Sequence, residues 1–328
     1  MKKILTILAI LMMTVCPQMV WGISAVQPTT GDGTADNPYE IATAGNLVWF
    51  ANKVNDGNGS ICGKLTADID MGSDQTMIGA SNNMYAGTFD GGEHTVTIKY
   101  TATYGYTALF RFAGGATIKN LKTAGTISTG YQYAGGVISY SDGATIVSRC
   151  ECSVVIKASS SNSWLKPQHG GIVSYSQGTL SLSDCVFDGQ LLGTYKDKKC
   201  GGLVGRAEST TTISNCLFNP SAAATLSSTD ACTMARGNDV KITNCYYTAA
   251  FGTVQGTQAT SDMLTSGELC YKLNMAVRPM AVWGGIRVLI TGRLLTPHLC
   301  HSVLIVLSMM EVTTAHPFLI LIYARHIL

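Results

Sequence analysis

Glycine pairs, apolar residues and cysteines return along the middle of the chain at nearly constant spacing. Three segments align without gaps: in each, an apolar residue lies eleven residues after the second glycine of a Gly-Gly pair, and a cysteine follows three residues later. These glycine, apolar and cysteine positions are Gly136, Val147 and Cys150; Gly171, Leu182 and Cys185; and Gly202, Ile213 and Cys216. The steps between cysteines are 35 (185 − 150) and 31 (216 − 185) residues, which predicts one structural unit per repeat.

The same pattern extends in both directions. Downstream, Ile242 and Cys245 repeat it 29 residues after Cys216, and upstream Ile118 and Leu121 repeat it 29 residues before Cys150. An earlier and more divergent copy surrounds Gly87–Gly91. One coil cannot bury an apolar residue by itself, whereas a stack of coils forms a continuous core. We therefore expect one buried structural ladder, formed by Leu121, Cys150, Cys185, Cys216 and Cys245.

The spacing within a repeat predicts where the chain turns. A spacing of two places side chains on one face of a strand, so the spacing of three between the apolar residue and the cysteine requires a bend. Asn and Asp tolerate left-handed backbone angles, which suits them to such a corner. The corner positions are Asn120, Arg149, Asp184, Asn215 and Asn244, with Arg149 and Asp184 expected to form an ion pair. The Gly-Gly pairs predict a second corner, where no Cβ is tolerated.

A period near thirty residues with two or three short strands per turn predicts an all-β fold. We expect a right-handed parallel β-helix of about six coils with a short N-terminal helical cap. Leucine-rich repeats need a Leu-x-x-Leu-x-Leu pattern that is missing here, and a propeller blade needs a longer repeat. The glycine, serine and threonine content also disfavours helices.

Five segments follow along the chain. Residues 1–22 are expected to be a signal peptide, with Lys2 and Lys3 before an apolar run and cleavage after Gly22. An uncleaved anchor and a lipoprotein at Cys16 are the alternatives. Residues 23–63 are expected to be an N-terminal capping segment, whose helix begins near Asn46 as the N-cap. The repeats fill 64–250, starting with a strand at Lys64–Asp70.

A C-terminal capping segment is expected at 251–283. Near Gly284 the sequence changes to an apolar, His-containing string without repeats, so 284–328 are interpreted as a frame-shifted or disordered tail, with a hydrophobic tail anchor as the alternative. We expect no membrane span in the mature chain. Cys200 and Cys232 are expected to precede the glycine corners of successive coils, and a disulfide between them remains open.

Several motifs together resemble proteins that carry the GLUG motif. These are Gly33-Thr34-Ala35-Asp36-Asn37-Pro38-Tyr39-Glu40-Ile41, Leu47-Val48-Trp49-Phe50-Ala51, Gly87-Thr88-Phe89-Asp90-Gly91, and the repeated Gly-Gly-Leu-Val-Gly followed by Ile-x-Asn-Cys. The resemblance covers roughly residues 30–275, and only Gly201–Gly205 matches the full core motif. It implies β-helical repeats of bacterial surface and adhesin-like proteins, some of them attached to IgA-specific metallopeptidases.

Net charge and the motifs present limit the classes of function that the sequence allows. Charged residues make up 13% of the chain and the net charge is +2, which gives no basis for nucleic-acid binding. No HExxH motif occurs, so the peptidase activity of the larger relatives is not expected here. Asp68 and Asp70 are too few for a calcium site and are interpreted as a solvated strand face. We expect no catalytic residue, metal or cofactor. The acids of the repeats are scattered, yet a polysaccharide lyase or glycosidase is the main competing function.

Aromatic residues gather before the glycine corners, in segments of variable length. Insertions of this kind cluster on one side of a solenoid, often the binding side. The sequence therefore predicts a secreted or cell-surface binding and adhesion module that recognises a carbohydrate or a host surface protein. An edge-protecting stack and a purely structural spacer are the alternatives. The candidate binding residues are Tyr104, Tyr106, Tyr131, Tyr133, Trp164 and Tyr195, while His94 and His169 are interpreted as isolated surface histidines.

Overall fold

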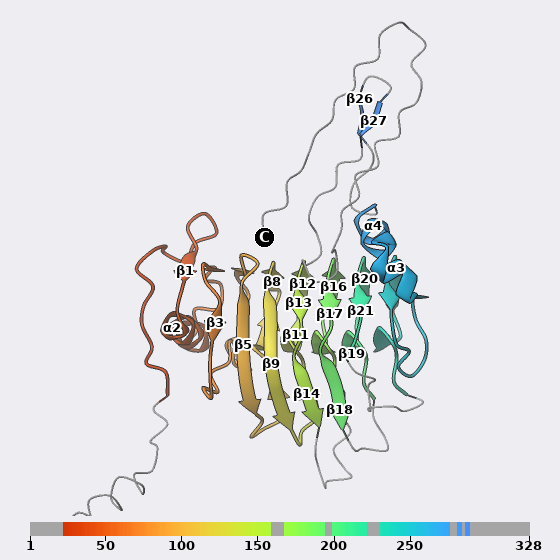
Figure 1. Cartoon of the computed structure of the whole chain (residues 1–328). Helices are drawn as coiled ribbons and strands as arrows, with labels where there is room; N and C mark the ends of the chain where they lie inside the picture. The colour runs from red at the N-terminus through yellow and green to blue at the C-terminus, as the bar shows by residue number, and fades with distance from the viewer. Residues whose placement is uncertain are drawn as a thin grey trace, which may run out of the picture.

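Successive repeats stack as parallel rungs, and the central coils each contribute strands to three sheets (Figure 1). The computed structural model describes residues 22–158, 167–193, 199–221 and 230–275, and also the strands β26 (Ala281–Trp283) and β27 (Ile286–Val288), which pair with each other. The result is an all-β solenoid of about six turns, as the repeat pattern predicts. The expected signal peptide, and the expected tail apart from β27, lie outside the described residues.

Three parallel sheets form the walls of the solenoid. Sheet A contains β1 (Tyr39–Ile41), β2 (Gly63–Leu65), β4 (Thr88–Asp90), β8 (Thr117–Lys119), β12 (Ala144–Ser148), β16 (Thr179–Ser183), β20 (Thr211–Ser214) and β23 (Val240–Thr243). Sheet B contains β3 (Ile69–Asp70), β5 (Thr95–Thr101), β9 (Lys122–Thr129), β13 (Glu151–Cys152), β14 (Val155–Ala158), β17 (Val186–Phe187), β18 (Gln190–Gly193), β21 (Leu217–Phe218), β24 (Tyr246–Tyr247) and β25 (Thr257–Gln258). Sheet C contains β7 (Phe110–Gly114), β11 (Ile138–Asp142), β15 (Val173–Ser176), β19 (Val204–Ala207) and β22 (Ala235–Gly237).

The first rung lies earlier in the chain than the sequence predicts. β1 pairs with β2 in register, so the stack of strands begins at Tyr39 and not at Lys64. The segment Lys64–Asp70 is not one strand: its first part belongs to β2 in sheet A, and its last two residues form β3 in sheet B. The expected capping segment 23–63 therefore contributes a rung as well as a helix.

The register of sheet A confirms the gap-free alignment of the repeats. Val147 pairs with Ile118 on one side and with Leu182 on the other, and the column continues through Ile213 and Ile242. Every coil thus places its apolar residue directly over that of the coil before. These side chains form one contiguous core with the inward residues of the other sheets.

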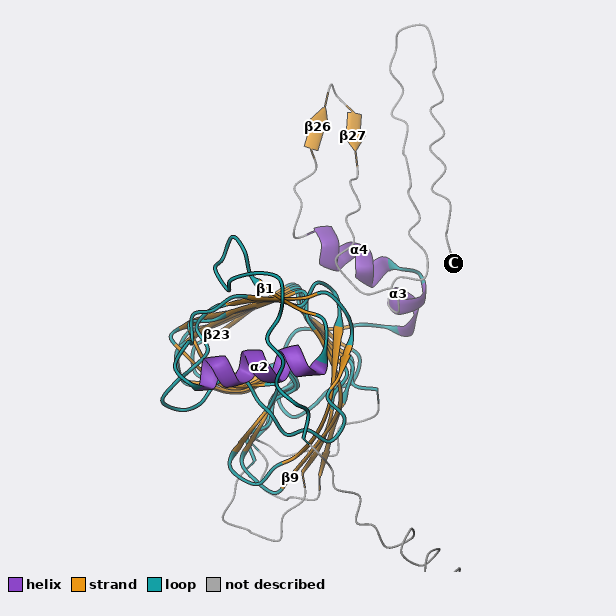
Figure 2. Cartoon of the chain, turned by 90° about the vertical axis from the view of Figure 1, so that its left-hand side faces the viewer, coloured by secondary structure: helices purple, strands orange, loops and turns teal. Residues whose placement is uncertain are grey.

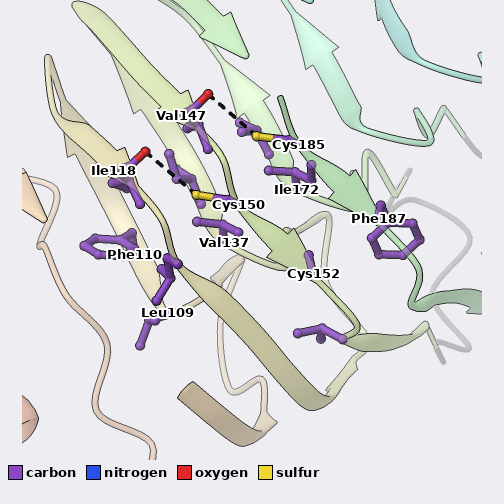
Figure 3. Packing of buried hydrophobic residues seen from close by; sticks show 14 of the residues in the cluster. Leu109, Phe110, Ile118, Val137, Val147, Cys150, Cys152, Ile172, Cys185 and Phe187 are labelled. Carbon is purple, nitrogen blue, oxygen red and sulfur yellow. Dashed lines mark hydrogen bonds between the residues drawn. The ribbon is translucent and has the colours of Figure 1, made fainter. Parts of the chain in front are cut away.

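The ladder of Leu121 and four cysteines lies inside this core. Figure 3 shows two of its members, Cys150 and Cys185, on neighbouring coils. All five side chains are at most 2% exposed, and backbone amides of each coil donate to the cysteine carbonyl of the coil before, as in Val186 to Cys150 (2.9 Å) and Leu217 to Cys185 (2.9 Å). Each thiol also donates to the carbonyl two residues earlier in its own chain, at 3.1–3.3 Å. Burial raises the pKa of Cys150, Cys185 and Cys216, so these thiols are neutral packing groups.

Five left-handed residues form the predicted corner between sheets A and B. Their φ values lie between 51° and 56°, at Asn120, Arg149, Asp184, Asn215 and Asn244. Side chains bond along the corner from coil to coil, as in Asn215 Nδ2 to Asp184 Oδ1 (3.0 Å) and Asn244 Nδ2 to Asn215 Oδ1 (2.9 Å). The expected ion pair between Arg149 and Asp184 is wrong: Arg149 Nε donates to Asn120 Oδ1 in the coil before (2.6 Å).

The glycine corner excludes a side chain because backbones meet there. Gly135, Gly170 and Gly201 pair with one another along the stack, and a Cβ on Gly201 would lie 1.9 Å from the carbonyl oxygen of Val204. Cys232 is the next member of this glycine column, since it pairs with Gly201. Cys200 and Cys232 are therefore one position out of step, which corrects the expected equivalence. The Cys232 thiol is free and so forms no disulfide with Cys200, whose thiol donates to the Pro167 carbonyl (3.7 Å).

An amphipathic helix closes the N-terminal end of the solenoid (Figure 2). Helix α2 (Ala44–Asn55) buries Leu47, Phe50 and Val54, and the ring of Phe50 contacts that of Phe89 at 5.7 Å. Its N-cap is Thr43, not Asn46: the Thr43 hydroxyl accepts from the Asn46 amide (3.2 Å), and Asn46 Oδ1 accepts in return from the Thr43 hydroxyl (2.9 Å). The side chain of Asn46, in the first turn of the helix, thus completes the cap.

The C-terminal helices cover a flank of the solenoid rather than its end. Helices α3 (Ser261–Thr265) and α4 (Glu268–Met275) lie outside the ring of strands (Figure 2) and pack Met263, Leu269 and Leu273 against the outer face of sheet B. Phe251 is 2% exposed and joins the core beside Phe218, so the segment before the helices covers the last coil. Within the described residues no helix is long and apolar enough to cross a membrane.

We expect Gly201→Ala to destabilise the fold, because the new Cβ would meet a backbone carbonyl that the next coil holds in place. The loss in the free energy of unfolding should be about 1–3 kcal/mol, measured by chemical denaturation. Gly105→Ala is the matched control, since the new Cβ would have no neighbouring atom within 4 Å. Equal stability of the two variants would contradict the packing described for this corner.

Arg149→Asn should stabilise the protein by about 1 kcal/mol, because asparagine accepts the left-handed backbone at lower cost than arginine. The reciprocal change, Asn215→Arg, should destabilise it, since it also removes the bonds to Asp184 and Asn244. Thermal unfolding of both variants measures the two effects. A stabilised Asn215→Arg would show that the corner has no asparagine preference.

Candidate functional site

An unusual set of aromatic side chains lies on the outer face of sheet C. Phe112, Tyr140 and Tyr175 pair in register on β7, β11 and β15, with neighbouring ring centroids 5.5 and 5.6 Å apart. In β11 the neighbours Ser139 and Ser141 are buried, whereas Tyr140 between them is half-buried and faces outward. Stacking of the coils therefore turns one aromatic residue per repeat into a continuous row.

A second row lies beside the first. Strands β6 (Tyr106–Thr107) and β10 (Tyr133–Ala134) pair with each other, and the rings of Tyr106 and Tyr133 stack at 4.7 Å with an angle of 7°. Tyr106 also contacts Phe112 (5.0 Å) and Tyr140 (5.7 Å), and Tyr133 contacts Tyr175 (5.3 Å). The two rows form what we call the tyrosine patch: Tyr106, Phe112, Tyr133, Tyr140 and Tyr175.

The rings in this patch stand against one another and do not lie flat on the surface. In the stacked pairs Tyr106–Tyr133 and Tyr140–Tyr175 a face of each ring covers a face of its neighbour. The hydroxyl of Tyr140 donates to Gln177 Oε1 (2.8 Å). Burial raises the pKa of Tyr106, Tyr140 and Tyr175, so their hydroxyls remain protonated hydrogen-bond donors at neutral pH. The patch thus combines apolar ring edges with polar tips.

One arginine borders the patch at its N-terminal end. The guanidinium of Arg111 lies 3.9 Å from the ring centroid of Tyr104 and 5.1 Å from that of Phe112. Such contacts are cation–π interactions, worth about 0.5–2 kcal/mol according to burial. Tyr104 is 42% exposed, which makes it the most open aromatic residue of this surface.

The structure brings together three of the six predicted binding residues, namely Tyr104, Tyr106 and Tyr133. Tyr131 is half-buried and takes part in none of the ring contacts of the described residues. Trp164 and Tyr195 lie outside the described residues. None of these placements tests binding, so the binding role stays a prediction.

Sequence reasoning missed Phe112, Tyr140 and Tyr175. The signal was present, because Tyr140 and Tyr175 each lie four residues after the second glycine of a Gly-Gly pair. The same offset from Gly202 gives Arg206, which pairs with Tyr175 in the structure. The repeat alignment was used to predict inward columns from their apolar residues. The aromatic row lies in an outward column, four residues after the second glycine, which that alignment was not used to assign.

The interpretation of His169 as a surface residue is wrong. Its side chain is fully buried, and its Nδ1 accepts a hydrogen bond from the Ala134 amide (3.0 Å), which joins two coils. His94 instead lies 3.3 Å from Asp68, whose pKa is lowered mainly by a hydrogen bond from the Thr95 amide. Asp68 therefore has a structural partner.

Acidic groups of the repeats bind neighbours of their own. Glu151 pairs with Lys122 at 3.9 Å, Glu208 pairs with Arg206, and Asp184 accepts from Asn215. Among the residues that the structure describes, no group of three or more metal-ligating side chains occurs. The geometry of the described part thus favours the tyrosine patch as the candidate site over an acid pair or a metal centre.

Together, the fold and this surface define a parallel β-solenoid with an aromatic outer face. No family model matches the chain, and no curated protein matches it. Among solved structures, a crystal structure described as that of "a putative immunoglobulin A1 protease from Bacteroides ovatus" is similar, with 16% sequence identity and a TM-score of 0.48. The match covers 77% of this chain and 91% of that chain, and it assigns no activity to this protein.

Half-buried tyrosine hydroxyls make the stability of the patch sensitive to alkaline pH. Tyrosines of the unfolded chain ionise near pH 10, while the raised pKa of Tyr106, Tyr140 and Tyr175 keeps them protonated in the folded state. Their contribution to stability is complete below about pH 10 and is lost as the pH rises further. The triple variant with phenylalanine at these positions should therefore lose less stability above that pH than the wild type. Denaturation curves across the alkaline range measure this, with the exposed Tyr271→Phe as control.

Proposed function

We propose that this chain is a non-catalytic binding module, exported to the cell surface or the medium, whose tyrosine patch binds a protein partner. The observation that carries the proposal is the contiguous set of five aromatic rings on neighbouring coils, in which four half-buried tyrosines surround the buried Phe112. Aromatic side chains that gather on one outer face of a folded chain commonly mark an interaction site. The resemblance to GLUG-motif surface and adhesin-like proteins supports the same class of function.

Tyrosine suits protein recognition because it gives a large contact area with few rotatable bonds. It also places an apolar ring edge and a hydrogen-bonding tip side by side. Tyrosine and arginine are enriched among the residues that dominate binding energy at interfaces, and both are present here. The tyrosine patch therefore has the composition of a protein-binding surface.

The patch is also held rigidly before any partner arrives. Phe112, Tyr140 and Tyr175 project from strands that are paired in register within sheet C, over a core of fully buried residues such as Phe110, Ile138 and Val173. Side chains that are ordered in advance lose little conformational entropy on binding. Rigidity of this kind favours a partner with a matching surface.

Ring geometry favours a protein over a sugar. Aromatic residues that bind sugars offer an open ring face to the apolar side of the pyranose, whereas the stacked pairs in the patch cover such faces with each other. Arg111 in turn lies over the ring of Tyr104. Each stacked ring thus has one face covered by its neighbour, which leaves less open ring face for a sugar than an isolated tyrosine offers.

Substituting the patch should abolish binding without unfolding the chain. We expect Tyr133→Ala and Tyr140→Ala each to lose about 2 kcal/mol or more of binding free energy, the value typical of dominant interface residues. The measurement is binding of the full chain to an array of purified extracellular-matrix proteins printed beside glycans. Tyr271→Ala, which removes an exposed tyrosine from α4, is the matched control.

Circular dichroism and melting temperature separate binding from folding in this experiment. A purely structural role of the tyrosines predicts a lowered melting temperature and no captured protein. Capture of a neutral glycan that is lost in the same two variants would overturn the assignment to a protein partner. Turnover of a polysaccharide by the wild type would support the competing enzyme function instead.

A further inference from the structure

Arg111 occupies a position at which the following coils hold a small residue. The register of sheet C places Arg111 opposite Ser139, and the column continues through Ser174 and Gly205. The two serines are fully buried, and their hydroxyls donate to the carbonyls of Tyr133 (3.1 Å) and Gln168 (2.8 Å). Three coils thus fill this position with a small residue, while the coil beside the tyrosine patch fills it with a long cation.

The cation has no counter-ion within the described part of the chain. The ion pairs there use other basic residues, such as Arg206 with Glu208 and Lys199 with Asp230. The Nε atom of Arg111 is buried and has no hydrogen-bond partner among the described residues. Partial burial lowers the pKa of Arg111, which reflects solvation that the guanidinium has lost. A buried donor without a partner destabilises the folded chain, and a bound acceptor removes that destabilisation.

The aromatic rings around Arg111 orient its guanidinium in a way that suits a carboxylate ligand. Rings of Tyr104 and Phe112 lie within 3.9 and 5.1 Å of the guanidinium, which positions the group without neutralising it. A planar guanidinium that stacks on an aromatic ring keeps its N–H edges for hydrogen bonding, and its fork geometry matches a carboxylate. In a partly desolvated setting such a pair is stronger than at an open surface.

We infer that Arg111 is the anion anchor of the tyrosine patch and that the partner is a protein presenting an aspartate or glutamate carboxylate to it. The inference rests on the proposed function of the patch and adds the chemical class of the partner segment. The patch receives the apolar and hydrogen-bonding part of that segment, and Arg111 receives its carboxylate. A partner with glutamine or asparagine at the same place is discriminated against, because an amide cannot neutralise the guanidinium.

The test uses the full chain and an array of synthetic peptides, each printed in an acidic form and in a form with amide side chains in place of the carboxylates. We expect the wild type to bind acidic forms at least about tenfold better than their amide partners, which is 1.4 kcal/mol. Arg111→Ser should remove this preference. The variant should fold, because serine is the residue that two later coils hold at the equivalent position.

Four further variants make the result specific. Arg111→Lys should recover part of the preference, since it restores the charge but not the fork. Arg206→Gln should keep the preference, because Arg206 is already paired with Glu208. Tyr133→Ala and Tyr140→Ala should lose binding to both peptide forms. Binding of the wild type should also weaken with added salt, whereas residual binding of Arg111→Ser should not.

The outcomes separate the inference from the proposed function. If Arg111→Ser keeps the preference for acidic peptides while the tyrosine variants lose binding, the role of Arg111 is wrong and the proposed binding function of the tyrosine patch is supported. If the tyrosine variants bind peptides as the wild type does, the proposed function fails as well. Sodium polygalacturonate, printed on the same array, supplies carboxylates on a sugar; its capture through Arg111 in place of acidic peptides would overturn the protein class of the partner.

Discussion

Backbone hydrogen bonds between successive coils fix which residues lie on top of one another. Because the strands are parallel and paired in register, a side chain in this solenoid has its repeat counterparts as neighbours above and below. Apolar residues therefore cover apolar residues, thiols cover thiols, and left-handed corner residues bond along the corner. A substitution in one coil is felt mainly by the two coils beside it.

The same constraint explains the outer surface. An outward residue that recurs at a fixed offset becomes a row, and two such rows meet in the tyrosine patch. A residue that differs in type from its counterparts in the other coils is equally informative, because stacking like residues on one another does not explain it. Arg111 replaces a small residue beside the patch, which is why it carries the functional inference. Arg149 replaces an Asn or Asp at a corner that still holds its left-handed geometry, so its effect is limited to stability.

Much of the interior could be predicted from spacing alone, since core columns and both corners depend on residues within one repeat. Features that depend on contacts between distant segments could not. Thr43 and Asn46 are both good cap residues, and only the reciprocal hydrogen bonds identify Thr43 as the N-cap. Helices α3 and α4 lie on the flank because sheet B carries outward apolar residues there, namely Val186, Leu217 and Tyr246. The repeat alignment includes these three residues but does not show which face of the sheet they occupy. Two of the five residues of the tyrosine patch, Tyr106 and Tyr133, were found because aromatic residues gather before the glycine corners. The other three were missed because they project from the strands of a different sheet.

The central claim is that the stacked thiols form one dry stripe inside a single cooperative solenoid. Native-state alkylation, quantified at each cysteine by mass spectrometry, tests it most directly. Cys150, Cys185 and Cys216 are at most 2% exposed, whereas Cys232 is only half-buried. The account predicts that Cys232 is alkylated in the folded protein, while the three ladder thiols react together and only at the denaturant concentration of global unfolding. Alkylation of the ladder thiols under native conditions, at the rate of Cys232, would contradict it.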